Sequence, residues 1–310
     1  MATIQFGDHG GDLSTPVVHD TVITTATSTF AEEISPDGWR FTSTGEFTGP
    51  GMGTMTSYTG YAPDGSLAYS ISGIHTDVSL FYSYVNSGNV YSLVTLLAAG
   101  ADTVTGGAGN DTARGAAGND TFDGRGGVDT AVYGSTRATY TITRTALDTW
   151  KVASGVDGTD TLTNVERLKF SDKSLAFDLS GSGHAAETAE IIGAAFGTSS
   201  LLIPDYVGIG LGLFDGGMSM DEVCALVPRT PAFMALSGTQ SNVEFVNLVY
   251  KNVTDNLPST VERDFYVNML QGSGGTMSQA ELLKLAATCD TNVAHIGLVG
   301  MQATGIEYSL

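Results

Sequence analysis

The chain has 310 residues, of which 33 are acidic and 13 basic, so its net charge is −20. This length is enough for two domains of ordinary size, and a hydrophobic fraction of 42% allows packed cores and argues against general disorder. A surface this negative repels nucleic acid and anionic lipid, so nucleic-acid binding is not expected. It suits an environment rich in divalent cations, because bound cations offset part of the self-repulsion.

The first residues, MATIQFGDHGGDLSTPVV, contain neither a basic n-region nor an apolar h-region, so a conventional secretory signal is not expected. No run of about 18 apolar residues occurs, so no membrane span is expected. Two cysteines, Cys224 and Cys289, are too few for a disulfide framework. They either form one pair or remain small buried thiols, and the sequence leaves both open.

Residues 1–96 predict a β-rich region. They are rich in Thr, Ser, Gly, Tyr and Val, and short alternating stretches such as 66–72 are interrupted by Gly, Asp-Gly and Gly-Pro. This composition predicts many short strands joined by turns. From about residue 77 to residue 97, strand and helix predictions compete.

Residues 97–131 repeat with a period of nine: LAAGADTVT, GGAGNDTAR, GAAGNDTFD and GRGGVDTAV. One column of the repeat is Gly100, Gly109, Gly118 and Gly127, a second is Asp102, Asp111, Asp120 and Asp129, and an apolar column is Val104, Ala113, Phe122 and Ala131. A flexible Gly-rich linker has no reason to keep Gly and Asp in a fixed register. The period therefore indicates a repeated structural unit.

Each repeat offers the chemistry of a calcium site. Six residues make a turn and three make a short strand whose apolar side chain points inward. Gly permits positive φ and lets carbonyl oxygens converge, Asp adds a carboxylate, and calcium takes 6–8 oxygen ligands. Because two repeats make one coil, turns 18 residues apart stack on the same edge. We therefore expect one ion between the turns of Asp102 and Asp120, and another between those of Asp111 and Asp129.

The predicted metal-binding residues are Gly100, Asp102, Gly107, Gly109, Asn110, Asp111, Ala116, Gly118, Asn119, Asp120, Gly127 and Asp129. Without metal, each edge stacks like charges, and the four inward residues of the apolar column bury too little surface to offset the ordering of the segment. Calcium is therefore expected to be required for folding here. The repeats depart from the pattern at Leu97, Ala98, Ala99, Ala101, Ala116 and Arg125, most of all in the first turn.

Residues 132–182 predict further strands, at 138–143, at 149–152 and within DTLTNVERLKFSD at 160–172. From about residue 185 the apolar period becomes helical, and Ser278 with Glu281 predicts a capping box. Residues 214–223 resemble 270–282, which indicates a loose helical repeat.

The expected fold is multidomain α and β: an N-terminal parallel β-roll or solenoid with β-rich flanks, followed by an all-α domain. The predicted boundaries are 1–96 for a β-rich extension, 97–131 for the roll, 132–182 for a strand cap and 183–310 for the helical domain.

The nonapeptides resemble those of the RTX family, and the stretches around them are similar to segments that flank RTX repeats: 54–58 and 65–73 before, 160–172 after. The C-terminal residues 245–253, 265–270 and 277–283 are similar to the domain of unknown function 4214, although its Arg-x-Pro-Asp and Gly-x-x-x-Trp elements are absent.

The RTX resemblance implies calcium as the bound ion and export from a Gram-negative cell by type I secretion machinery, through an uncleaved C-terminal signal. An extracellular or cell-surface location follows from it. Residues 296–310 are then a candidate signal region, with a packed terminal strand or helix as the alternative interpretation.

The motifs of common enzymes are missing: the sequence has no H-E-x-x-H, no G-x-S-x-G and no Gly-Lys pair. The glycine run 208–212 is interpreted as allowing close helix packing or a turn. His75, His184 and His295 are scattered and are interpreted as surface or capping residues.

Three further acidic groups leave alternatives open. His9 and His19 with Asp8, Asp12 and Asp20 form either a metal site or a flexible polar start. Asp157 and Asp160 either hold another calcium ion or belong to an Asp-Gly hairpin turn. Asp123 is either a peripheral ligand or a solvated side chain.

These patterns favour a non-enzymatic extracellular calcium-binding protein that associates with itself or with a cell-surface or matrix partner, in a surface layer, matrix or adhesive assembly. Two alternatives stand beside it. One is a secreted hydrolase or toxin with an acidic site in the N-terminal β region, and the other is a calcium-dependent module that binds a small ligand or a glycan.

Overall fold

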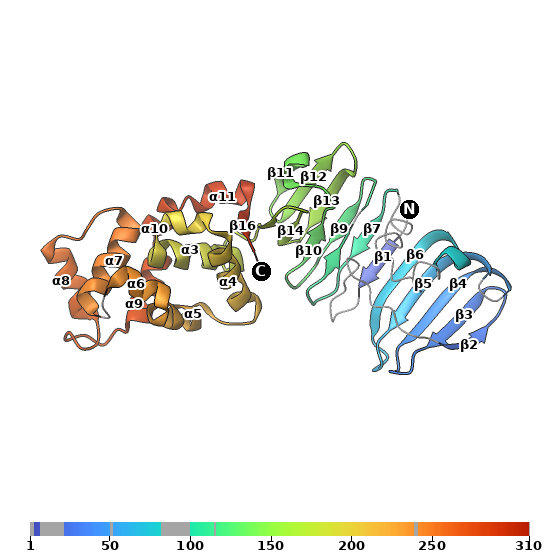
Figure 1. Ribbon diagram of the computed structural model, residues 1–310, viewed down its shortest axis with the longest axis horizontal. Coiled ribbons are helices and arrows are strands. Elements are labelled where there is room, and N and C mark those ends of the chain that lie inside the picture. The colour runs from blue at the N-terminus through green and yellow to red at the C-terminus, as the bar shows by residue number, and fades with distance from the viewer. Residues whose placement is uncertain are drawn as a thin grey trace. The chain divides into compact units, whose positions relative to one another are not determined.

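The computed structural model describes residues 3–6, 22–49, 52–81, 100–114, 116–238 and 241–309. The chain divides into two compact units, Met1–Asp172 and Lys173–Leu310. The first is built from strands and the second mainly from helices (Figure 1). A β-rich N-terminal half and a helical C-terminal half are thereby confirmed.

The first unit contains an antiparallel sheet of β2 (Val22–Ala26), β3 (Phe30–Ile34), β4 (Arg40–Gly49), β5 (Met52–Tyr61) and β6 (Leu67–Asp77). Three of these strands have ten or eleven residues, so the prediction of many short strands is wrong here. Glycine does not end these strands, because it lies at irregularities in the strand pairing, where the strand continues. One such register shift lies between Thr44 and Gly45. A Cβ at Gly45 would overlap the carbonyl oxygen of Thr54, so the bulge requires glycine.

Some predictions lie outside the described residues. Residues 78–81 are helical, but the rest of the segment where strand and helix compete, including Leu97, Ala98 and Ala99, is not described. The same holds for the N-terminal group of His9, His19, Asp8, Asp12 and Asp20.

The repeats form two parallel ladders. In one, β7 (Thr103–Thr105) pairs with β9 (Thr121–Asp123), which pairs with β13 (Gly158–Thr163). In the other, β8 (Thr112–Ala113) pairs with β10 (Thr130–Val132), which pairs with β14 (Arg167–Lys169). Within the repeats, the paired residues are 18 positions apart, as the nonapeptide period predicts. A short strand, β1 (Thr3–Phe6), joins β7 to β6 of the antiparallel sheet.

The apolar column of the repeats lies inside the coil, as predicted: Val104, Ala113, Phe122 and Ala131 are all buried. The inward layer is larger than the sequence suggests, because the cap adds Leu162 opposite Phe122 and Leu168 opposite Ala131. The four repeat side chains are therefore not the whole core of the coil.

A hairpin separates the repeats from the strands that continue them. After a 3-10 turn, η1 (Arg137–Thr139), β11 (Thr141–Ala146) and β12 (Thr149–Ser154) pair antiparallel, and β12 pairs with β13. Buried Trp150 of β12 lies opposite Leu162. Nearby, the rings of Tyr133, Tyr140 and Phe170 pack together with centroids 4.9–5.5 Å apart.

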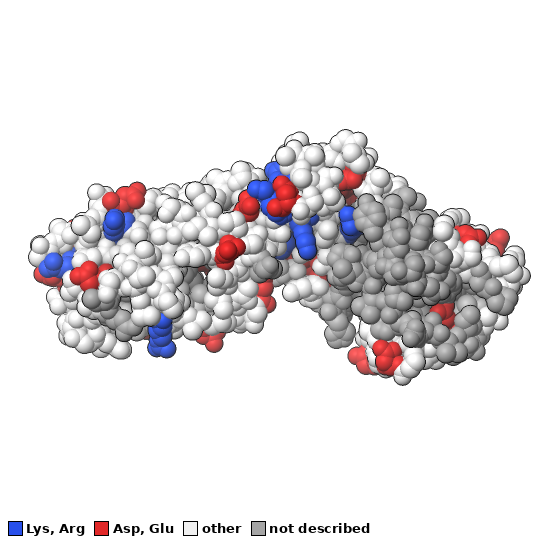
Figure 2. Space-filling view, in the orientation of Figure 1, with Lys and Arg blue, Asp and Glu red and all other residues white. Residues whose placement is uncertain are grey.

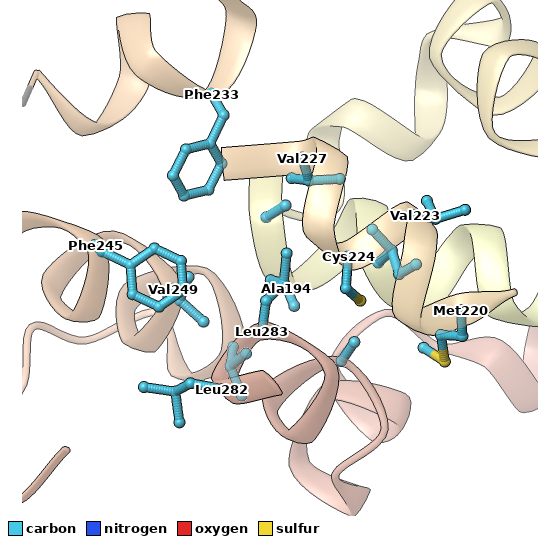
Figure 3. Close-up of a cluster of buried hydrophobic side chains, with 14 of the residues drawn as sticks. Ala194, Met220, Val223, Cys224, Val227, Phe233, Phe245, Val249, Leu282 and Leu283 are labelled. Atoms are coloured by element: carbon cyan, nitrogen blue, oxygen red, sulfur yellow. The ribbon is translucent and has the colours of Figure 1, made fainter. Parts of the chain in front are cut away.

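The second unit packs its helices around a core that includes Ala194, Cys224, Phe245 and Leu283 (Figure 3). The elements are α3 (His184–Phe196), η2 (Thr198–Leu202), α4 (Pro204–Asp215), α5 (Met220–Leu226), η3 (Val227–Arg229), α6 (Pro231–Ser237), α7 (Asn242–Thr254), α8 (Thr260–Met269), α9 (Gln279–Ala287), α10 (Asp290–His295) and α11 (Leu298–Thr304).

The predicted capping box of Ser278 and Glu281 is present at the start of α9. The corresponding residues Ser219 and Glu222 form another at the start of α5, so the two similar segments share this local structure.

The second unit is not purely helical, which corrects the expectation of an all-α domain. Strand β15 (Ser174–Ala176) pairs antiparallel with β16 (Ile306–Tyr308). Because this pair belongs to the second unit, that unit begins at Lys173 rather than at the expected residue 183. The C-terminal residues thus adopt the packed alternative, with Ile306 and Tyr308 buried.

The glycine run 208–212 lies within α4, where a Cβ at Gly208 would overlap the carbonyl oxygen of Ser309. A Cβ at Gly210 would overlap the side chain of Thr188 on α3, so the interpretation as a site of close helix packing is confirmed. Within the described part of the chain, none of the helices combines the length and apolar character needed to cross a bilayer.

Candidate metal centre

The four repeat aspartates are linked from coil to coil by their carboxylates. The backbone N–H of Asp102 donates to Asp120 Oδ1 at 2.9 Å, and that of Asp111 donates to Asp129 Oδ1 at 2.7 Å. These four side chains are only 1–6% exposed. They are therefore distinct from the scattered acidic side chains that colour the face of the molecule in Figure 2.

Two of these residues have a second carboxylate oxygen that no hydrogen bond from the described part of the coil satisfies. Oδ2 of Asp120 and Oδ2 of Asp129 are buried and meet no hydrogen-bond donor among the described residues. Burial, with neighbouring carboxylates adding to it, raises the pKa of Asp120 to about 6 and the pKa of Asp129 to about 8. A buried, deprotonated carboxylate without a counter-charge is costly, so these positions favour a bound cation.

Glycine is required where the coils approach each other. Gly100, Gly118 and Gly127 have φ of +111°, +152° and +110°. A Cβ at Gly118 would lie 1.8 Å from the carbonyl oxygen of Gly100, and a Cβ at Gly127 would lie 2.5 Å from that of Gly109. At Gly118 and Gly127 the absence of a Cβ thus lets the backbone carbonyls of successive coils approach closely.

The oxygen atoms that surround Gly106 are of the kinds that a calcium ion would bind. A Cβ at Gly106 would lie less than 3.0 Å from both the carbonyl oxygen of Gly124 and Asp111 Oδ2. A carbonyl and a carboxylate of successive coils thus face one small space. Hard oxygen donors of these two kinds are the ligands that calcium prefers. The residues present fit the ion.

Three other predicted ligands make hydrogen bonds in the coil, and a fourth has an unusual backbone conformation. The side-chain oxygens of Asn110 and Asn119 accept hydrogen bonds of 2.8 Å from the backbone of Val128 and Thr159, so both asparagines link neighbouring coils. The Gly107 N–H donates to Asp111 Oδ2 at 2.7 Å. The remaining residue, Ala116, has φ of +104°, a conformation that favours glycine.

Two acidic residues that the predicted ligand set omits continue the columns. The Asp120 N–H donates to Asp160 Oδ1 at 3.0 Å, and the Asp129 N–H donates to Glu166 Oε2 at 2.8 Å. The sequence carries a signal for Asp160, since Asp160-Thr-Leu162 repeats the order Asp-Thr-apolar of the nonapeptides. Asp157 lies in the turn between β12 and β13, as the Asp-Gly hairpin alternative expects. Asp160 accepts its hydrogen bond from the neighbouring coil at the same time, so the hairpin does not exclude a place for Asp160 in the aspartate column.

The other candidate residues have local partners. His184 Nδ1 lies 2.6 Å from Asp215 Oδ1, and His295 Nε2 lies 2.9 Å from Asp255 Oδ2. Asp123 Oδ1 accepts a hydrogen bond of 3.0 Å from Asn164 Nδ2.

Both cysteines are free thiols, and burial raises the pKa of Cys224 to about 12. Within the described ranges, no three His, Cys, Asp or Glu side chains gather as a metal cluster.

Residues 98–131 match the family model of the RTX calcium-binding nonapeptide repeat, in four copies. These repeats bind calcium, so the predicted ion is confirmed and the chain is a calcium-binding protein. RTX repeats are typical of secreted proteins. A search of the curated proteins finds no match to the chain.

Proposed function

We propose that this is a secreted, non-enzymatic structural protein whose residues 97–131 fold as a β-roll when calcium fills the turns. It acts in a surface layer, an extracellular matrix or an adhesive assembly. The observation that carries the proposal is the pair of buried oxygens, Asp120 Oδ2 and Asp129 Oδ2, that meet no hydrogen-bond donor among the described residues. A divalent cation shared by two coils supplies the missing charge.

The calcium concentration around the protein determines whether this segment folds. Extracellular calcium modules commonly have a Kd of about 10⁻⁴–10⁻³ M. Turns with such an affinity stay empty at cytosolic calcium and fill outside the cell. The stacked carboxylates then repel one another before export and bind the ion after it, so the roll folds where it is needed.

A non-enzymatic role is supported by the contacts of the side chains that could otherwise act in catalysis. His184 and His295 are each held by an aspartate of the same unit. Cys224 is buried in the helical core, where burial holds its thiol protonated. The buried carboxylates of the coil bind backbone N–H groups of the next turn. These arrangements stabilise structure.

An assembly is supported by apolar residues left exposed on the helical unit. Val261 and Phe265 lie one turn apart on α8, and Leu257 precedes that helix; they are 80%, 61% and 70% exposed. Exposed apolar groups this close together are typical of surfaces that contact a partner. We assign this surface to contacts within the assembly.

The test is size-exclusion chromatography combined with circular dichroism, with calcium and with EGTA. We expect calcium to increase β structure and to move the protein to larger species at high concentration. Full β structure in EGTA would argue against calcium-dependent folding. A monomer at high protein and calcium concentrations would argue against an assembly.

A second candidate function is ligand binding by the helical unit. A cavity of about 330 Å³ is lined by apolar side chains, among them Val249 and Leu282, and by Tyr250 and Tyr266. Its size suits a small apolar or aromatic molecule. An anilinonaphthalene dye tests it: binding in calcium-loaded wild type that Ala286→Phe abolishes, with association unchanged, would favour this function.

A further inference from the structure

We propose that the calcium sites continue beyond the four nonapeptides, with one additional ion between the turn of Asp129 and residues 164–166. Its ligands are Asp129 Oδ2, the backbone carbonyl of Asn164 and the carboxylate of Glu166. This inference rests on the proposed function, because it takes the repeat turns as calcium sites.

We call the small space beside Gly106, which a carbonyl oxygen and a carboxylate oxygen face, a cradle. The same arrangement recurs one coil later at Gly124. A Cβ at Gly106 would lie less than 3.0 Å from the Gly124 carbonyl oxygen and from Asp111 Oδ2. In the same way, a Cβ at Gly124 would lie less than 3.0 Å from the Asn164 carbonyl oxygen and from Asp129 Oδ2. The Asn164 carbonyl therefore takes the place of the Gly124 carbonyl.

The hydrogen bonds around the two cradles correspond as well. The Asp111 N–H donates to Asp129 Oδ1 at 2.7 Å, and the Asp129 N–H donates to Glu166 Oε2 at 2.8 Å. The Gly106 N–H donates to the Asp123 carbonyl at 2.7 Å, and the Gly124 N–H donates to the Thr163 carbonyl at 2.9 Å. Glu166 thus stands where a further repeat would place its aspartate.

The backbone of Asn164 has the conformation that the site needs. Its φ is +51°, in the left-handed region, which asparagine tolerates better than most residues. Its side chain donates to Asp123 Oδ1 and so fixes the turn. The main-chain carbonyl can then face the cradle as a glycine carbonyl does.

Asp129 supplies an independent indication of a ligand. The side chain is 1% exposed, and its Oδ2 atom is buried and meets no hydrogen-bond donor among the described residues. This atom and the Asn164 carbonyl oxygen both face the space at Gly124. Two buried oxygens facing one space repel each other unless a proton or a cation lies between them, and a calcium ion satisfies both oxygens when the carboxylate is ionised.

The test is the number of calcium ions bound by the full chain, measured by equilibrium dialysis at saturating calcium. We expect Glu166→Gln to bind one ion fewer than wild type. This variant retains an oxygen that can accept from the Asp129 N–H, and circular dichroism checks its fold. The matched control is Asp148→Asn, which removes an exposed carboxylate from the hairpin and should leave the number unchanged.

An unchanged ion count in Glu166→Gln would overturn this inference while leaving the repeat sites intact. Wild type that binds no calcium would instead overturn the proposed function. A measurement without a variant tests the same point: anomalous density for calcium in crystals of the wild type. Density between Asp111 and Asp129 with none between Asp129 and Glu166 would contradict the additional site.

Discussion

The backbone N–H of Asp120 donates a 3.0 Å hydrogen bond to Asp160 Oδ1, although the two residues are 40 positions apart. Within the repeats, the same bond joins Asp102 to Asp120 across 18 positions. The hairpin of β11 and β12 lies between the two parts of the column. The coil therefore resumes after the hairpin, and the repeats and the cap share one core.

Chelation should open the repeats and spare the helices. The Thr121 and Thr130 amides donate to the carbonyls of Asp102 and Asp111, both at 2.8 Å, and these bonds depend on the stacked turns. In EGTA we expect fast hydrogen exchange over 100–131, because the carboxylates then repel one another. The core helices α7 and α9 belong to the other compact unit and should keep their protection. Hydrogen-exchange mass spectrometry measures both, and unchanged protection of 100–131 would contradict the prediction.

Calcium affinity should fall as the pH is lowered from 8 to 6. Burial raises the pKa of Asp129 to about 8 and the pKa of Asp120 to about 6, so protons compete with the ion in this range. We expect a loss of roughly tenfold or more in affinity, measured by calorimetry. Affinity that is constant over this range would show that these carboxylates do not bind the ion.

Without calcium, folding stability should depend on pH in the opposite direction to calcium affinity. The folded-state pKa values of Asp120, Asp129 and Asp160 are raised to about 6, 8 and 7, above those of an unfolded chain. At these three residues the folded state therefore binds more protons, so their contribution to stability is fully present below about pH 4 and is lost as the pH rises through 6 to 8. Thermal melts in EGTA should show a lower melting temperature for the first unit at pH 8 than at pH 5.

Gly118→Ala should disrupt the stacking of the coils. The new Cβ would overlap the carbonyl oxygen of Gly100, and φ at this position is +152°. Overpacking costs about 1–3 kcal/mol, and the backbone strain adds to it. Calcium titration followed by circular dichroism should show a higher midpoint. Gly155→Ala is the matched control, because a Cβ there meets open space, and it should leave the midpoint unchanged.

Ala116→Gly should stabilise the roll. Ala116 has φ of +104°, which strains any residue with a Cβ. Relief of this strain exceeds the added chain entropy of glycine, for a net gain of up to about 1 kcal/mol. The measurement is the melting temperature in saturating calcium, with Ala117→Gly as the comparison, since Ala117 is not among the positive-φ residues. A lower melting temperature for Ala116→Gly would contradict this account.

The sequence by itself determined what depends on local chemistry. The nine-residue period predicts that Asp102 and Asp120 share an edge, that Phe122 faces inward, and that calcium is the ion, because Gly turns and strand alternation are local properties. Ser278 and Glu281 predict their helix start for the same reason.

Only the tertiary structure decided which distant residues complete the coil. Asp160 and Glu166 join the aspartate columns across the hairpin, which hides the period in the sequence. Leu162 and Leu168 enlarge the core by the same route, and β16 pairs with β15 across more than a hundred residues of helices. The order Asp160-Thr-Leu162 carries a local signal for one of them, but the pairings themselves arise from packing between segments far apart in the chain.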